Sequence, residues 1–307
     1  MVDAFLRSRF RLQKKTCEIA VHFSDPSQVP IRKRIRMALR PLYFFLAYLL
    51  ISGPGCKPSA AVNVIPPPKP VPQVTDLNLK FPNGACRGKL IVPATAETGP
   101  SKLPALLLIH EDHGLTEWEL AQGRRLAEAG YAVLAVDLYD GQKVDTVMDA
   151  HIMGRALPEE TVLAALGSAL DYLQSRSDVE PGRLGVIGWD LGGTYALDIA
   201  RRDPRLKACV ICYGGVVTDA GLLAPMKAAV LGIFGGKDAG ITDETVAAFR
   251  KALQKAGKQY EIKVFPNSPH GFMNPASPEA GGNADPQTTQ AAWDAIHSFL
   301  AAELKKP

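Results

Sequence analysis

Cysteine is scarce in this chain, which has five in 307 residues. Cys17 and Cys56 lie outside the expected folded body, and Cys86 lies in an early loop. Cys209 and Cys212 are three residues apart in one predicted strand, so they point to opposite faces of it. That arrangement is poor geometry for a disulfide or for a zinc site. We therefore predict that both are buried core side chains.

A surplus of basic side chains is also missing from the body of the chain, although the net charge is +4. Residues 1–56 hold ten Lys and Arg and three acids, which leaves 25 basic and 28 acidic side chains for the rest. The body therefore carries a net charge of −3, which argues against nucleic acid as its partner. Hydrophobic content of 47% and charged content of 21% are ordinary for a globular protein.

The apolar run Leu42–Ile51 is too short for an ordinary membrane span, which needs about 20 residues. Basic residues 32–36 precede it, and this order is typical of a secretory signal; Met37 is an alternative start. The following Ser52–Cys56 resembles a bacterial lipoprotein signal, in which Cys56 becomes the lipidated first residue. We expect an exported, periplasmic or membrane-anchored protein. Plain secretion, a single N-terminal anchor and a cytoplasmic location are the alternatives.

Three segments follow from these patterns. Residues 1–56 form a basic leader with the signal-like apolar run. Residues 57–73 are rich in proline, which favours an extended, semi-rigid spacer. Residues 74–307 form the folded domain, and the spacer would tether this domain to the N-terminal segment.

The folded domain alternates strands with helices. Several strands are continuous apolar runs such as 106–109, as expected for strands buried on both faces of a parallel sheet. The alternation predicts an α/β three-layer sandwich with a mostly parallel sheet of about eight strands. Functional residues should then lie at the carboxyl ends of the strands. The expected strands are Asp76–Phe81, Lys89–Pro93, Ala105–Glu111, Ala132–Tyr139, Arg183–Trp189, Ala208–Tyr213, Ala229–Gly235 and Tyr260–Phe265, and the expected helices are Glu117–Ala129, Glu159–Arg176, Leu191–Arg202, Asp243–Ala256 and Gln287–Leu304.

Asp190 is central to the domain's chemistry. It lies in Gly188-Trp189-Asp190-Leu191-Gly192, between a predicted strand and a predicted helix. A strand, a sharp turn flanked by glycines and a helix form the layout of a nucleophile elbow, in which the usual pattern is G-x-S-x-G. Here an aspartate stands at the central position.

Two further candidates follow later strands in the order acid, then base. Asp238 ends the run after the strand 229–235, and His270 lies between Pro269 and Gly271 after the last strand. Nucleophile, acid and histidine in this order are typical of α/β-hydrolases. The alternative for Asp238 is a cap on the helix that begins near Asp243. A histidine between proline and glycine is a poor candidate for the core.

His110-Glu111-Asp112-His113 after the third strand invites interpretation as a metal site. A further separated ligand pattern is lacking, and this loop is where the hydrolase fold makes half of its oxyanion hole. We therefore predict neither a metal nor another cofactor.

Taken together, five stretches over residues 75–304 resemble the dienelactone hydrolase family of α/β-hydrolases. The resemblance implies a catalytic set of Asp190, Asp238 and His270, with Glu111 in contact with the nucleophile. It also implies an oxyanion hole made by the backbone N–H groups of Leu191 and Asp112, and Arg155 as a candidate for binding a substrate carboxylate. The matching stretches are IHEDHGL (109–115), RRLAEAGYAVLAVDLYDG (124–141), GRLGVIGWDLGG (182–193), FGGKD (234–238) and PHGFMNP (269–275).

The family's usual nucleophile is cysteine, sometimes serine, so Asp190 changes the chemistry. A carboxylate that attacks an ester carbonyl gives a mixed anhydride, and the carboxylate leaves again more readily than an alkoxide does. An aspartate works better at saturated carbon, where it forms an alkyl-enzyme ester that histidine-activated water then hydrolyses. If Glu111 lies beside Asp190, the like charges should raise one pKa, and one of the two carboxyls would hold a proton.

We therefore expect a hydrolase that acts on an ester or lactone of a small molecule. Attack of Asp190 at saturated carbon, as in dehalogenases and epoxide hydrolases, is one alternative. A non-catalytic ligand-binding protein is the other, and a direct water-activating site is compatible with the same residues.

Overall fold

The computed structural model describes residues 71–81, 84–94, 102–277 and 285–305. The predicted leader, Cys56 and almost all of the proline-rich spacer lie outside the described residues, so the domain boundaries remain predictions. Within the described part of the chain, no helix combines the length and the apolar character that a membrane crossing requires.

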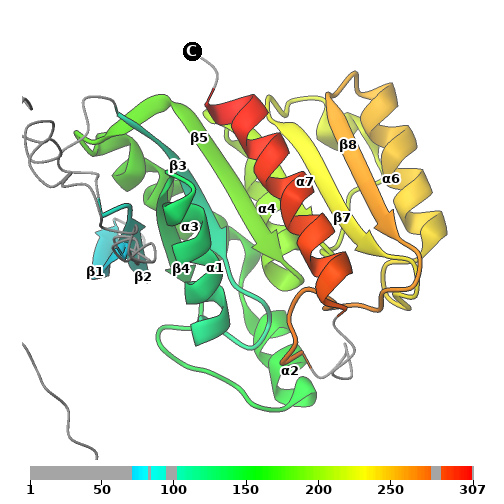
Figure 1. Cartoon of the computed structure of the whole chain (residues 1–307), viewed down its shortest axis with the longest axis horizontal. Coiled ribbons are helices and arrows are strands. Elements are labelled where there is room, and N and C mark those ends of the chain that lie inside the picture. The colour runs from blue at the N-terminus through cyan, green and yellow to red at the C-terminus, as the bar shows by residue number, and fades with distance from the viewer. Residues whose placement is uncertain (1–70, 82–83, 95–101, 278–284, 306–307) are drawn as a thin grey trace, which may run out of the picture. The chain divides into compact units, whose positions relative to one another are not determined.

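One eight-stranded sheet runs through the described residues, in the order β1-β2-β4-β3-β5-β6-β7-β8 (Figure 1). β2 is antiparallel to both of its neighbours, whereas the pairs from β4 to β8 are parallel. The strands are Gln73–Phe81 (β1), Gly84–Val92 (β2), Leu103–Ile109 (β3), Ala132–Asp137 (β4), Val179–Trp189 (β5), Leu206–Cys212 (β6), Ala229–Gly235 (β7) and Tyr260–Phe265 (β8).

Helices cover both faces of this sheet. α1 and α7 pack on one face, with Leu126 and Trp293 among the buried contacts. α3, α4 and α6 pack on the other, with Leu166 and Phe249 in that cluster. The predicted three-layer α/β sandwich is therefore confirmed. The helices are Glu117–Glu128 (α1), Val147–Ala156 (α2), Glu159–Ser175 (α3), Leu191–Arg202 (α4), Ala220–Leu223 (α5), Asp243–Lys255 (α6) and Pro286–Leu304 (α7).

The two cysteines of β6 take opposite faces, as their spacing predicts. Cys209 is buried against α4 and donates its thiol to the carbonyl of Ala196, whereas Cys212 packs in the cluster on the other face. Both thiols are free. Burial raises the pKa of each of them, which keeps them protonated and unreactive.

Helix α2 was not predicted, because its apolar residues do not mark a buried face. Met148 and Ile152 are 68% and 60% exposed, and Ala150 is the buried residue of the helix. The available signal was local: Thr146 caps the helix and its hydroxyl accepts from the backbone N–H of Asp149. The short α5 was missed as well, since four residues carry no measurable periodicity.

Candidate active site

The elbow is formed where β5 ends at Trp189 and α4 begins at Leu191. Asp190 between them has φ +48° and ψ −116°, a strained conformation for a residue with a Cβ. Its neighbours need to be glycine. A Cβ on Gly188 would lie 2.0 Å from the carbonyl oxygen of Gly192, and one on Gly192 would lie 2.3 Å from that of Ile109. The tight turn is further held by the Asp190 N–H, which donates to a carbonyl of β6.

Asp190, His270 and Asp238 form one continuous hydrogen-bonded chain. His270 Nδ1 lies 2.7 Å from Asp238 Oδ2, and His270 Nε2 lies 3.1 Å from Asp190 Oδ1. Asp238 Oδ1 accepts two backbone N–H groups, from Gly240 and Ile241, which fix the carboxylate. The three residues predicted to act together therefore meet at the carboxyl edge of the sheet. Thr242, not Asp238, caps α6, so the capping alternative for Asp238 is wrong.

The two carboxylates hold a proton on His270. Burial disfavours the imidazolium, but the hydrogen bonds that it donates to Asp190 and Asp238, and the negative charges of these two residues, outweigh burial and raise the pKa of His270 to about 10. Burial acts against the charge of Asp238 as well, yet its bond from His270 and the backbone N–H groups lower its pKa. At neutral pH His270 is therefore an imidazolium, held between Asp190 and Asp238.

Glu111 is the second residue after β3 and is 5% exposed. Its Oε1 accepts from Tyr213 Oη at 2.9 Å, and its Oε2 accepts from Asn274 Nδ2 at 2.6 Å. Burial is the largest cause that raises its pKa to about 8, followed by the charge of Glu119, with Asp190 contributing least. The sequence predicted a raised pKa for one of two carboxyls; the structure assigns it to Glu111, with desolvation as the main cause.

The histidines of the His110-x-x-His113 motif are both hydrogen-bonded to backbone groups. His110 Nε2 accepts from the Leu138 N–H at 3.0 Å while Nδ1 donates to the Glu111 carbonyl, so the ring is neutral, and burial lowers its pKa. His113 Nδ1 lies 2.7 Å from the Val144 carbonyl. Within the described ranges, no three His, Cys, Asp or Glu side chains form a group suited to a metal ion.

Leu191 is the first residue of α4, so its N–H has no acceptor inside the helix and is available to a bound oxyanion. Asp112 follows β3 at the same edge, with its side chain 14% exposed and 3.7 Å from His151 Nε2. Assignment of these two N–H groups to an oxyanion hole stays a prediction. Arg155 lies at the exposed end of α2, outside the set of side chains that line the cleft.

A cleft of about 570 Å³ opens onto Asp190 and His270. His151 of α2 is on its rim, and its floor includes Tyr213, whose ring stands edge-on to His270 at 5.2 Å. The loops after β6, β7 and β8 supply the rest of the wall: Gly215, Lys237, Asp238, Ala239, Gly240, Ile241 and Pro269.

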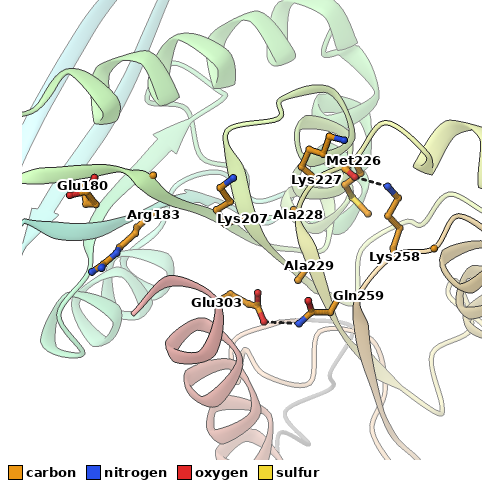
Figure 2. Close-up of a pocket in the computed structure, with 12 residues that line it drawn as sticks. Glu180, Arg183, Lys207, Met226, Lys227, Ala228, Ala229, Lys258, Gln259 and Glu303 are labelled. Atoms are coloured by element: carbon orange, nitrogen blue, oxygen red, sulfur yellow. Dashed lines mark hydrogen bonds between the residues drawn. The ribbon is translucent and has the colours of Figure 1, made fainter. Parts of the chain in front are cut away.

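A second cavity, of about 630 Å³, lies at the amino ends of β6, β7 and β8, at the opposite edge of the sheet (Figure 2). Its basic side chains include Lys207, Lys227 and Lys258, and Lys258 Nζ donates to the Met226 carbonyl at 2.6 Å. Gln259 Nε2 donates to Glu303 across it. It has no carboxylate–histidine chain, so we assign the chemistry to the other edge.

Sequence reasoning missed three residues of the site. Tyr213 follows β6 at the catalytic edge with φ +41°, and it could have been found as a polar residue at a strand end. Asn274 lies in the PHGFMNP stretch, four residues after His270. His151 belongs to α2, which the sequence pattern did not reveal, so no signal pointed to it.

Comparison with known proteins agrees with this geometry. Residues 90–304 match the dienelactone hydrolase family. A Methylorubrum extorquens protein named as a carboxymethylenebutenolidase is 32% identical over 201 residues, which are 59% of this chain and 68% of that protein. A Bradyrhizobium protein named as a 2-oxo-3-(5-oxofuran-2-ylidene)propanoate lactonase is 29% identical, over 66% of this chain and 85% of that protein.

Solved structures share the fold. A dienelactone hydrolase-like promiscuous phosphotriesterase from metagenomic libraries superposes with a TM-score of 0.67 at 24% identity, over 76% of this chain and 99% of that one. A dienelactone hydrolase from Anabaena variabilis gives a TM-score of 0.57 at 21% identity, over 76% and 99% of the two chains. The family match, the relatives and the shared fold lead to one assignment: the chain belongs to the dienelactone hydrolase family and is a hydrolase of the α/β-hydrolase fold.

Proposed function

We propose that this protein hydrolyses an ester or lactone of a small molecule, and that Asp190 and His270 act directly on water instead of forming an acyl-enzyme. The observation that carries the proposal is the Asp238–His270–Asp190 chain, with its proton on His270, at the cleft. A relative named as a lactonase supports a lactone as the substrate.

The charges of the resting site suit this route. Asp190 is bound to His270 through Oδ1, and we assign its Oδ2 to the attacking water. As the water oxygen bonds to the carbonyl carbon, Asp190 takes a proton from the water. The π electrons of the carbonyl bond move to the carbonyl oxygen, and the N–H groups of Leu191 and Asp112 would stabilise this oxyanion. The C–O bond to the leaving group then breaks, and His270 gives its proton to the leaving oxygen. Transfer of the proton from Asp190 to His270 restores the resting state.

An acyl-enzyme is the weaker route for this chain. Attack by Asp190 on the carbonyl would form an anhydride, and its tetrahedral intermediate would expel the carboxylate in preference to an alkoxide. An imidazolium at His270 also lacks the lone pair that a general base needs.

Attack at saturated carbon is the second candidate, and the same electrostatics favour it. When the Asp190 oxygen displaces a leaving group such as halide, the resulting alkyl ester is neutral. One of the two carboxylates that raise the pKa of His270 is then lost. The pKa falls, His270 releases its proton, and with Asp238 behind it the neutral ring can activate water to hydrolyse the ester.

The test is turnover of a panel of aryl esters, five- and six-membered lactones and haloalkanes by the purified protein. Turnover of esters or lactones, with no covalent adduct on His270→Ala by intact mass, is the expected result. Turnover of haloalkanes, with an alkyl adduct trapped on Asp190 in His270→Ala, would instead establish the second candidate and overturn the first.

We also propose that the protein is exported and tethered through its N-terminal segment. The basic residues 32–36, the apolar run 42–51 and Cys56 support this proposal. Labelled palmitate should be incorporated into the wild type and not into Cys56→Ser. A protein that stays in the cytosol, unlabelled, would contradict it.

A further inference from the structure

Tyr213 is a buried aromatic residue of the cleft to which the proposed reaction assigns no step. It follows β6 at the carboxyl edge of the sheet and lines the cleft together with Asp190 and His270. Its backbone has φ +41°, a left-handed conformation that a bulky side chain rarely adopts. Strain of this kind persists only where the surrounding structure fixes the residue.

The surroundings fix Tyr213 from its backbone to its hydroxyl. Its backbone N–H donates to the Ile233 carbonyl of β7 at 2.7 Å, and its hydroxyl donates to Glu111 Oε1 at 2.9 Å. Burial, followed by the charge of Glu111, raises the pKa of Tyr213 well above its usual value, so the hydroxyl keeps the proton that it donates. The next residue, Gly214, packs tightly against α4, since a Cβ there would lie 2.5 Å from the carbonyl carbon of Gly193.

The fixed ring lies against the histidine of the catalytic chain. The centres of the Tyr213 and His270 rings are 5.2 Å apart, with 65° between the ring planes. His270 has to place Nδ1 against Asp238 and Nε2 against Asp190 at the same time, at 2.7 Å and 3.1 Å. Both hydrogen bonds are well aligned only over a narrow range of ring rotation, so a rigid neighbour beside the imidazole favours this geometry.

Glu111 links the Tyr213 ring to the loop that carries His270. Its second oxygen, Oε2, accepts from Asn274 Nδ2 at 2.6 Å. The backbone N–H of Asn274 in turn donates to the carbonyl of Gly271, the residue after His270, at 2.8 Å. One buried carboxyl is thus hydrogen-bonded both to the ring beside the imidazole and to the loop that bears the imidazole.

We propose that Tyr213 is a positioning residue for hydrolysis: its ring, anchored to Glu111, holds the His270 imidazole in line between Asp238 and Asp190. The inference rests on the proposed ester or lactone hydrolysis, in which His270 gives its proton to the leaving oxygen. Tyr213 exchanges no proton and forms no bond to the substrate. An imidazole that rotates out of line misses the leaving oxygen, so the loss falls on kcat and not on substrate binding.

The kinetic test compares Tyr213→Leu, which removes the ring, with Tyr213→Phe, which removes only the anchor to Glu111. Tyr213→Leu should lower kcat by about 100-fold with KM nearly unchanged, because a misplacement of about 1 Å has that effect. Tyr213→Phe keeps the ring and should recover most of this loss, with kcat about 10-fold below the wild type. Tyr131→Phe is the matched control and should keep the wild-type kcat, since Tyr131 is buried and its hydroxyl has no partner among the described residues.

Proton NMR of the substrate-free protein at pH 7 provides a readout that needs no turnover. The two ring N–H protons of His270, assigned by their loss in His270→Ala, should resonate well downfield of the amides, because both are donated to carboxylates. Tyr213→Leu should remove these signals, whereas Tyr213→Phe should keep them with faster exchange with water. Tyr131→Phe should leave them unchanged, and melting temperatures report any folding defect separately.

The outcomes separate this role from the proposed function. Wild-type kcat in folded Tyr213→Leu, or ring N–H signals that it leaves unchanged or that the wild type lacks, would overturn the role of Tyr213 and leave the hydrolysis standing. Signals lost in folded Tyr213→Leu, in a protein that hydrolyses no ester or lactone, would overturn the proposed function and keep Tyr213 as the residue that positions His270. If Tyr213→Leu does not fold, Tyr213→Phe decides: wild-type kcat and wild-type exchange in that variant would overturn the role.

Discussion

The two edges of the sheet hold cavities of similar size and different chemistry. The carboxyl edge has a cleft of about 570 Å³ and the amino edge has one of about 630 Å³. At the carboxyl edge, the buried Asp238 and the partly exposed Asp190 both lie within hydrogen-bond distance of His270. At the amino edge, exposed Lys207 and Lys227 point toward water. Volume therefore does not identify the site. In open parallel sheets, functional residues gather at the carboxyl ends of the strands, and the chemistry of the lining agrees with that edge here.

The largest difference between the edges should appear on substitution of Asp190. Asp190→Asn keeps the shape and removes the base, so hydrolysis should fall by about 10³-fold or more, and His270→Ala should do the same. Lys207→Ala together with Lys227→Ala is the matched control at the amino edge and should leave kcat/KM unchanged. Steady-state kinetics on one ester measures these effects. A comparable loss of kcat/KM in the double-lysine variant would contradict the assignment of the chemistry to the carboxyl edge.

The second prediction concerns stability against pH, and Glu111 carries it. The pKa of Glu111 is about 8 in the folded protein and about 4.5 as an unperturbed group, so the folded state binds more protons between these values. The free energy of unfolding should therefore fall as pH rises from about 4.5 to 8. Glu111→Gln should flatten this part of the curve in urea titrations. An unchanged slope would show that Glu111 is ionised at neutral pH.

His270 extends the same trend to higher pH. Its pKa is raised from 6.5 to about 10, so its stabilising contribution is complete below pH 6.5 and is lost as pH rises through 10. The direct water route also needs the imidazolium as acid, so kcat should fall only above about pH 9. A rate that climbs with an apparent pKa near 7 would indicate that His270 acts as a neutral base at rest.

The smallest expected effect is on the surface of the amino edge. Arg183→Ala should change the free energy of unfolding by no more than about 0.5 kcal/mol and leave the hydrolysis rate unchanged. Arg183 lines the amino-edge cavity, at the opposite edge of the sheet from the Asp238–His270–Asp190 chain. Urea unfolding at pH 7 checks this. A large loss would mean that the amino-edge cavity has a structural role.

The sequence alone predicted the β/α alternation. It also predicted that Asp190, Asp238 and His270 would lie together, because each follows an apolar run and has a local signal beside it. The glycines around Asp190 indicate a backbone turn that leaves no room for a side chain. At Gly188, for example, a Cβ would lie 2.0 Å from the carbonyl oxygen of Gly192. Partners that come from distant segments could not be predicted in the same way. Tyr213 Oη and Asn274 Nδ2 reach Glu111 across 102 and 163 residues of chain.

Protonation also depended on the three-dimensional structure. The pattern around Asp190 and Glu111 predicted that one of these two carboxyls would hold a proton. In the folded protein, burial is the main cause that raises the pKa of Glu111, and Asp190 contributes least to it. For His270, burial acts in the other direction, and the hydrogen bonds and charges of Asp190 and Asp238 outweigh it. Desolvation depends on which side chains close over a group, and no spacing along the chain records that.

Oxygen labelling tests the direct use of water most simply. The enzyme should be mixed in excess with a lactone or ester in H₂¹⁸O, for a single turnover, and both the product and the peptide containing Asp190 should be weighed by mass spectrometry. Our account predicts one ¹⁸O atom in the product acid and none in the Asp190 carboxyl, with no product from Asp190→Asn. A first-turnover product without ¹⁸O, together with ¹⁸O in the carboxyl of Asp190, would contradict it and establish Asp190 as a covalent nucleophile.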